Sequence, residues 1–337
     1  MATPIVDAHL DLAHNVLAGR DYTLEVADIR RAEAAEQLQC MVSLPELRKG
    51  NVAVVFATVY TGPNSWSDDG QPVYNAPPWD GARSQLAVYR RWSEEGRVRL
   101  VTSRRQLDSH LELWAEDGLT GLVFLMESAD AIAHPRDLPD WWADGIRLIG
   151  PAWSRTRYAG GTHRPGGLTE LGRELVARMA EQGIALDTSH LAEEAFWQAL
   201  EIGAHATLAS HSNARAIVDT DRQLSDEMIG AIGDCDGVVG LNLYDEFLHP
   251  GWARNADRPQ VTLDDVRRHA EHIAGLIGWD RVGIGSDLDG GLGLEETPTE
   301  LGSIADLGRI GDVAPPEQRA GVLGENWLAW LRRTLPA

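Results

Sequence analysis

Lysine and cysteine are scarce in this chain of 337 residues. Lys49 is the only lysine, so arginine supplies the rest of the 30 basic residues. Two cysteines, Cys40 and Cys235, are too few for a disulfide framework or a cysteine-rich zinc ribbon. No apolar run approaches the roughly 20 residues of a membrane-spanning helix, and the start, MATPIVDAH, lacks the basic and apolar segments of a signal peptide. We therefore predict a cytoplasmic protein that does not bind membranes.

Positive charge is also in short supply. The 51 acidic residues outnumber the 30 basic ones, and the formal net charge is −21. A surface of this sign repels nucleic acid and anionic lipid, so both are excluded as partners. The length exceeds that of an ordinary domain but is usual for one α/β barrel. Because the sequence shows no internal repeat or linker, we predict a single domain over residues 1–337.

Short apolar segments alternate with longer helical patterns along the chain, which is typical of repeated βα units. The segments predicted as strands are 5–9, 52–58, 121–127, 145–149, 184–187, 207–210, 238–243 and 282–285. Helices are predicted between them, for example at 81–95, 169–182, 193–202 and 263–276. Eight strands that alternate with helices predict an α/β fold of the (β/α)₈ TIM-barrel type.

Four long segments rich in glycine and proline follow predicted strands rather than precede them. These segments are 60–80, 154–168, 249–261 and 289–303. In a barrel of parallel strands they all lie at the carboxyl ends, where barrel enzymes place their active sites.

Residues able to bind metal stand at the ends of these strands. The first strand ends in DAHLD, and alternation along a strand points His9 and Asp11 the same way. Further acids and histidines of this kind terminate later predicted strands, namely Glu127, His190, His211 and Asp287. Each has an ordinary explanation alone, such as a helix cap or a core histidine, but their common placement predicts a metal centre.

Imidazole nitrogen and carboxylate oxygen without thiolate suit zinc, and suit manganese, iron or cobalt less well. Two metals side by side need a bridging anion. A carbamylated lysine serves in many barrel hydrolases, but Lys49 lies before the second strand and no other lysine exists. Glu127 is therefore the predicted bridge.

The other donors then divide between two metal positions. His9 and Asp11 complete one position, and His190 with His211 completes the other. Asp287 has a separate predicted role, because a carboxylate beside a metal-activated water can accept its proton and transfer it to a leaving nitrogen.

The chain resembles the membrane (renal) dipeptidase family of the amidohydrolase superfamily. The motifs that carry the resemblance are DAHLD, Glu127, LDTSHL, SHSNAR, DRQLSDE, VVGLNLY, GIGSDLDG and GENWL. The resemblance implies a (β/α)₈ metallopeptidase with two zinc ions and no carbamylated lysine. It assigns zinc binding to His9, Asp11, Glu127, His190 and His211, and the role of catalytic acid/base to Asp287.

The resemblance also suggests substrate-binding residues. Arg222 matches an arginine that binds the carboxylate at the C-terminus of the dipeptide, a task suited to a bidentate guanidinium. Tyr244 matches a tyrosine of the substrate pocket. The chain departs from the family after the fourth strand, where Trp153 replaces a histidine that polarises the substrate carbonyl. His163 in the same loop is a candidate substitute, and His14 stands where dipeptidases tend to carry an aromatic residue.

Three functions are consistent with these residues. The first is a zinc dipeptidase that tolerates a D-residue at the C-terminal position. The second is a binuclear metal amidohydrolase that acts on N-acyl amino acids, which also carry a free carboxylate for Arg222. The third is a metal-binding barrel with little turnover, because Trp153 has replaced the histidine. The predicted partner is thus a small molecule, and a homodimer is expected by analogy with the family alone.

Overall fold

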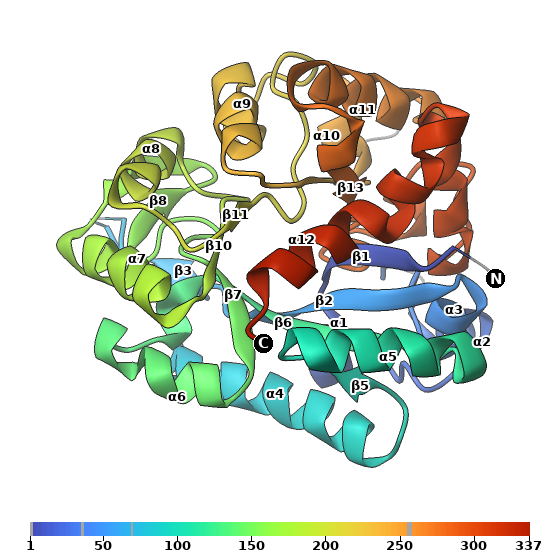
Figure 1. The fold of residues 1–337 in the computed structure, drawn as a ribbon, viewed down its shortest axis with the longest axis horizontal. Coiled ribbons are helices and arrows are strands. Elements are labelled where there is room, and N and C mark those ends of the chain that lie inside the picture. The colour runs from blue at the N-terminus through green and yellow to red at the C-terminus, as the bar shows by residue number, and fades with distance from the viewer. Residues whose placement is uncertain (1–2, 35–36, 69, 255–257) are drawn as a thin grey trace.

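The computed structural model describes residues 3–34, 37–68, 70–254 and 258–337, and its main sheet is a ring of parallel strands (Figure 1). Its strands are β1 (Ile5–Leu10), β2 (Val52–Tyr60), β6 (Gly121–Glu127), β7 (Ile146–Gly150), β10 (Ala185–Asp187), β11 (Thr207–Leu208), β12 (Val239–Leu241) and β13 (Val282–Ile284). Hydrogen bonds join them in the order β11-β10-β7-β6-β2-β1-β13-β12. A parallel bridge between Ala209 and Val239 links the two ends of this order. The predicted barrel of eight strands is confirmed, although β11 and β12 are shorter than predicted.

Helices surround the ring on its outside (Figure 1). They are α1 (Leu12–Leu17), α2 (Val26–Ala32), α3 (Leu44–Lys49), α4 (Pro78–Glu94), α5 (Arg104–Asp117), α6 (Leu138–Ala143), α7 (Glu170–Gln182), α8 (Glu193–Ile202), α9 (Asp226–Asp234), α10 (Asp245–Leu248), α11 (Leu263–Ile277) and α12 (Asn326–Thr334). The predicted helix at 81–95 begins earlier, because Pro78 is well suited to a first helical turn. In α11, Thr262 and Asp265 form a capping box. Every helix in the described ranges is too short or too polar to cross a lipid bilayer.

The long segments after the strands contain small hairpins of their own. β3 (Ser65–Trp66) pairs with β4 (Pro72–Val73), and β8 (Ala159–Gly161) pairs with β9 (Arg164–Leu168). The segment 249–261 includes residues 255–257, which lie outside the described residues. One further short strand, β5 (Arg99–Leu100), pairs with the start of β6. The hairpins build walls above the carboxyl ends of the ring.

The C-terminal helix α12 closes the opposite end of the barrel. In Figure 1 it lies across the centre of the ring, and Gly324, just before it, contacts Pro4 at the start of β1. Trp327 is fully buried, packs edge-on against Phe56 with ring centroids 5.2 Å apart, and donates from Nε1 to the carbonyl of Ile284 at 3.0 Å. Only the carboxyl-terminal end of the ring is therefore left for a functional site.

We predict that Trp327→Ala lowers the free energy of unfolding by about 3–5 kcal/mol, because it leaves a large cavity at the closed end. Chemical denaturation measures this change. Trp197→Ala on α8 is the control, because Trp197 is exposed and its loss should cost about 1 kcal/mol or less. Equal losses in the two variants would contradict the role given to α12.

Candidate metal centre and substrate pocket

A register shift in β1 aims its last residues at the centre of the ring. Asp7 pairs with Val55 but Leu10 pairs with Ala57, so β1 has one extra residue there. Before the shift, Val6 and Ala8 pack inside the barrel, whereas Leu10 packs in the outer core. The extra residue therefore turns His9 inward. His9 and Asp11 point the same way, as predicted, since their ligand atoms and one from Glu127 all lie within 4.8 Å of one another.

Glu127, at the end of β6, lies between two groups of side chains. Its Oε2 is 3.4 Å from His9 Nε2, and its Oε1 is 3.3 Å from His190 Nε2 and 3.7 Å from His211 Nε2. Two sets of three potential ligands share it, and they are His9, Asp11, Glu127 and Glu127, His190, His211. The structure thus brings all five predicted metal-binding residues together.

Two of the site residues have left-handed backbone conformations. The φ angle is 65° at His190 and 61° at Asp287. Such conformations cost about 1–3 kcal/mol in a residue other than glycine and gather at functional sites, where the surrounding structure holds them. Thr162 Oγ1 lies 3.0 Å from His190 Nδ1, and Asn242 donates to Asp287 Oδ2 at 3.0 Å. These contacts help fix both side chains.

Burial and mutual charge shift the pKa values of the cluster in different directions. Burial, with a contribution from Arg222, lowers the pKa of His190 to about 3. Burial alone would lower the pKa of His9, but Glu127 and other carboxylates raise it to about 10. Burial and neighbouring acids raise the pKa of Asp287 to about 8. Several acids therefore share one buried space with little positive charge.

The donor atoms fit divalent cations. The Nε2 atoms of His190 and His211 face each other at 3.0 Å, and His9 Nε2 is buried without a hydrogen-bond partner among the described residues. Imidazole nitrogens that converge on carboxylate oxygens form the mixed donor set that zinc accepts. A bound cation would also offset the repulsion between the buried carboxylates.

Above this cluster opens a cavity of about 690 Å³. The predicted residues Arg222, Tyr244, Trp153 and Asp287 line it, and so do His14 and His163. Trp153 packs edge-on against Tyr60 at 5.6 Å and lies 6.1 Å from the ring of His190. The cavity therefore connects the cluster with an aromatic wall.

Arg222 is buried beside the cluster with part of its donor capacity free. It donates to Ser212 Oγ at 2.9 Å and to the carbonyl of His211 at 2.6 Å. Its Nε is buried and has no hydrogen-bond partner in the described part of the chain. Since Arg222 lines the cavity, its remaining donors suit a bound anion.

Several supporting residues were missed in the sequence. Thr58 donates to Asp11, Thr162 contacts His190, and Asp187 with Ser210 lies behind His9 and His211. Asp187 stands in the LDTSHL motif, and this position close to a predicted ligand was the one available signal. The partners of the others become visible only in the fold.

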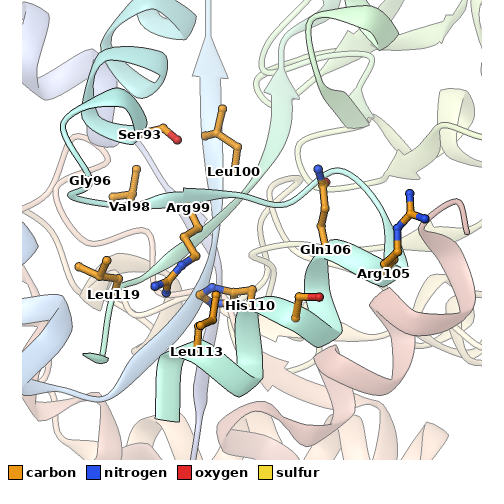
Figure 2. Close-up of a pocket in the computed structure, with 11 residues that line it drawn as sticks. Ser93, Gly96, Val98, Arg99, Leu100, Arg105, Gln106, His110, Leu113 and Leu119 are labelled. Carbon is orange, nitrogen blue, oxygen red and sulfur yellow. The ribbon is translucent and has the colours of Figure 1, made fainter. Parts of the chain in front are cut away.

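A second hollow, of about 620 Å³, lies between α4, β5 and α5 (Figure 2). None of the predicted site residues lines it, and its histidine, His110, hydrogen-bonds the carbonyl of Ala53 at 2.8 Å. Size alone does not separate the two cavities. Convergent ligands and shifted pKa values single out the cavity above Glu127.

Comparison with known proteins identifies the family. The sequence profile of the membrane dipeptidase family (peptidase family M19) matches residues 1–328. The chain belongs to this family. It is therefore a metallopeptidase, a hydrolase of the dipeptidase type, and the resemblance inferred from the motifs is confirmed.

Several relatives share sequence or fold with this M19 family member. A protein of Klebsiella pneumoniae, described as uncharacterized and in the pqqA 5′ region, is 34% identical over 245 residues, covering 69% of this chain and 86% of its own. An uncharacterized dipeptidase of Schizosaccharomyces pombe is 35% identical over 313 residues, covering 85% of this chain and 69% of its own. A crystal structure of a Rhodobacter sphaeroides metallopeptidase, liganded with a phosphinate mimic of L-Ala-D-Ala, has 26% identity and a TM-score of 0.82, covering 99% of this chain and 100% of its own.

The pKa shifts predict how the metal-free protein responds to alkali. Asp287 and His9 keep protons in the folded state that the unfolded chain has lost, so stability should fall as the pH rises from 6.5 through about 8. The slope is at most about 1.4 kcal/mol per pH unit for each proton. The low pKa of His190, about 3, acts below this window.

Urea unfolding in the presence of a chelator measures this fall. Asp287→Asn should flatten it, and loading with a divalent cation should reduce it because the cation stabilises the ionised carboxylates. A metal-free protein that becomes more stable between pH 6.5 and 8 would contradict the charge balance described here.

Proposed function

We propose that this M19 metallopeptidase is a dipeptidase that holds two zinc ions and tolerates a D-residue at the C-terminal position. His9 and Asp11 hold one ion, His190 and His211 hold the other, and Glu127 binds both. The observation that carries the proposal is the position of Glu127, whose two oxygens face different imidazole groups. Zinc, when bound, supplies Lewis-acid activation of water and of the scissile carbonyl.

Asp287 is the proposed proton carrier. It lines the cavity, and its Oδ1 lies 4.0 Å from His9 Nε2 while Asn242 holds Oδ2. Burial raises the pKa of this carboxyl to about 8, close to the range where a group both accepts and releases protons at neutral pH. It takes a proton from the attacking water and gives it to the leaving amine.

Arg222 is the proposed binding residue for the free carboxylate of the substrate. Its unpartnered Nε and open cavity face allow a charge-assisted hydrogen bond. Tyr244 and Trp153 form the adjoining walls. Tolerance for a D-residue is supported by the Rhodobacter sphaeroides relative, whose ligand mimics L-Ala-D-Ala.

A second candidate function is the hydrolysis of N-acyl amino acids. The aromatic wall of Trp66, Trp153 and Tyr60 favours it, because such a surface suits an apolar acyl group. Arg222 would serve either substrate class. The homodimer and the cytoplasmic location stay predictions of the sequence.

A substrate panel tests the function. We expect the zinc-loaded protein to hydrolyse L-L and L-D dipeptides, and Arg222→Lys should lower kcat/KM about 10- to 100-fold through loss of the guanidinium fork. Dipeptides with an amidated C-terminus are the matched control. They lack the carboxylate, so the substitution should barely change their already slow turnover.

Other outcomes of the panel select the alternatives. Turnover of acylated amino acids without turnover of dipeptides supports the second candidate. Metal binding with no turnover of any substrate would show that replacement of a histidine by Trp153 has removed the activity.

We predict that Asp287→Asn retains the metals and lowers kcat by about 10²- to 10⁴-fold, because the amide keeps the shape but cannot carry the proton. Elemental analysis and steady-state kinetics measure the two quantities. Near wild-type turnover in this variant would show that another group transfers the proton.

A further inference from the structure

Ser210 occupies a buried position behind two of the proposed zinc ligands. Its Oγ lies 2.6 Å from Asp187 Oδ2, 2.7 Å from His211 Nδ1 and 3.3 Å from His9 Nδ1. All four side chains are almost completely buried. One hydroxyl thus reaches the rear nitrogens of two imidazoles that belong to opposite metal positions.

The number of available hydrogens fixes the direction of these hydrogen bonds. Asp187 receives three donors, since its Oδ1 accepts from the backbone of Ser189 at 3.1 Å and of Ser210 at 2.9 Å, and its Oδ2 faces the Ser210 hydroxyl. The single hydroxyl hydrogen is therefore donated to Asp187. Both lone pairs of Oγ then accept N–H groups from His211 and His9.

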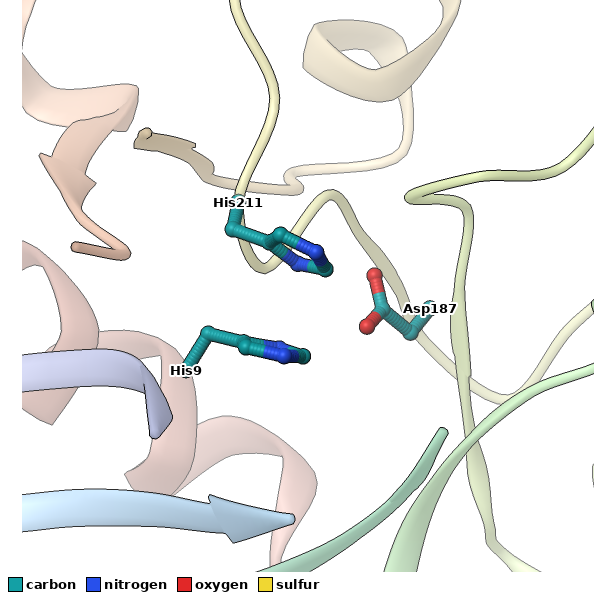
Figure 3. Close-up of side chains that lie close together, drawn as sticks. All are labelled: His9, Asp187 and His211. Atoms are coloured by element: carbon teal, nitrogen blue, oxygen red, sulfur yellow. The ribbon is translucent and has the colours of Figure 1, made fainter. Parts of the chain in front are cut away.

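The imidazoles are oriented for this arrangement. The rings of His9 and His211 stack with centroids 3.6 Å apart and an interplanar angle of 29°, and Figure 3 shows Asp187 beside the pair. Their Nδ1 atoms face Ser210, whereas their Nε2 atoms lie near Glu127. The same edge of each ring is thus turned toward the metal positions.

We propose that Ser210, held by Asp187, is a positioning residue that fixes His9 and His211 together as Nδ1–H tautomers. Each ring then presents the lone pair of Nε2 to its own zinc ion. The inference rests on the proposed two-zinc function and extends it, since one hydroxyl orients a ligand at both positions. His190 has a separate support, Thr162.

The competing interpretation makes Asp187 a metal ligand itself. One atom from each of His9, Asp187 and His211 lies within 4.8 Å of the others, as Figure 3 illustrates. The full set of donors to Asp187 argues against this interpretation. A ligand would also need the Nδ1 lone pairs, which a hydrogen bond to Ser210 excludes.

The chain contains a matched control for Ser210. Ser286 donates its hydroxyl to Asp7 Oδ2, and Asp7 Oδ1 accepts from the backbone of Ser286 at 2.8 Å. This pair has the same geometry on the neighbouring side of the ring. Within the described residues, the Ser286 hydroxyl makes no contact with an imidazole.

Zinc affinity of the purified full chain, measured by competition with a chromophoric chelator, tests the proposal. Ser210→Ala should weaken zinc binding at both positions, by about 10- to 100-fold, as loss of a supporting contact typically does. It should still bind as many ions as the wild type at saturation. Ser286→Ala should leave zinc affinity within about threefold of the wild type while it lowers kcat through Asp287.

The opposite pattern would overturn the proposal. If Asp187→Asn bound one zinc ion fewer and Ser210→Ala bound zinc normally, Asp187 would be a ligand. If the wild type bound zinc and Ser210→Ala matched it, the positioning role would fail while the proposed function stood. Absence of zinc binding by the wild type would instead reject the proposed function.

The wild-type protein gives a second test that does not depend on the folding of a variant. Imidazole ¹H–¹⁵N correlation spectra of the zinc-loaded chain should show slowly exchanging Nδ1–H protons for His9 and His211. Protons on Nε2 of either residue would contradict the assignment.

Discussion

The structure depends on one buried carboxylate that faces three imidazoles. Removing Glu127 from water is costly, and the cost is recovered only through close partners of opposite charge or through cations. Its partners come from β1 and from the turns after β10 and β11. A barrel of parallel strands satisfies this constraint, because every strand ends at the same face. The closed end at α12 can then be purely apolar.

Polar residues behind the cluster hold the loops that form the cavity. Asp289 accepts from the backbone of Met41 at 2.8 Å and of Val42 at 3.0 Å, and it also accepts from Tyr22 and pairs with Arg20. The GIGSDLDG motif thus contains two different acids. Asp287 lines the cavity with one oxygen free of hydrogen bonds to described residues, whereas Asp289 binds a distant loop. Hydrogen-bond satisfaction, and not residue type, separates their roles.

The wall of the cavity is tied to the same framework. Asp130, after β6, accepts from the backbone and side chain of Arg157 at 3.0 Å and from the hydroxyl of Tyr74. It joins the two segments that carry Trp153 and Trp66. Trp153 therefore has a defined place beside His190, and this place connects the departure from the family pattern with substrate choice rather than with the metal-binding cluster.

The sequence by itself determined the alternation of strands and helices, the residues at the strand ends, and the exclusion of a carbamylated lysine. These features follow from local periodicity and composition, so the barrel and the convergence of the five predicted ligands could be foreseen. Their chemical roles stay predictions. The tertiary structure alone decided the register shift before His9, the left-handed turns at His190 and Asp287, and the contact of His9 with Ser210, 201 positions away. Such features arise from packing between segments far apart in the chain, and no local pattern encodes them.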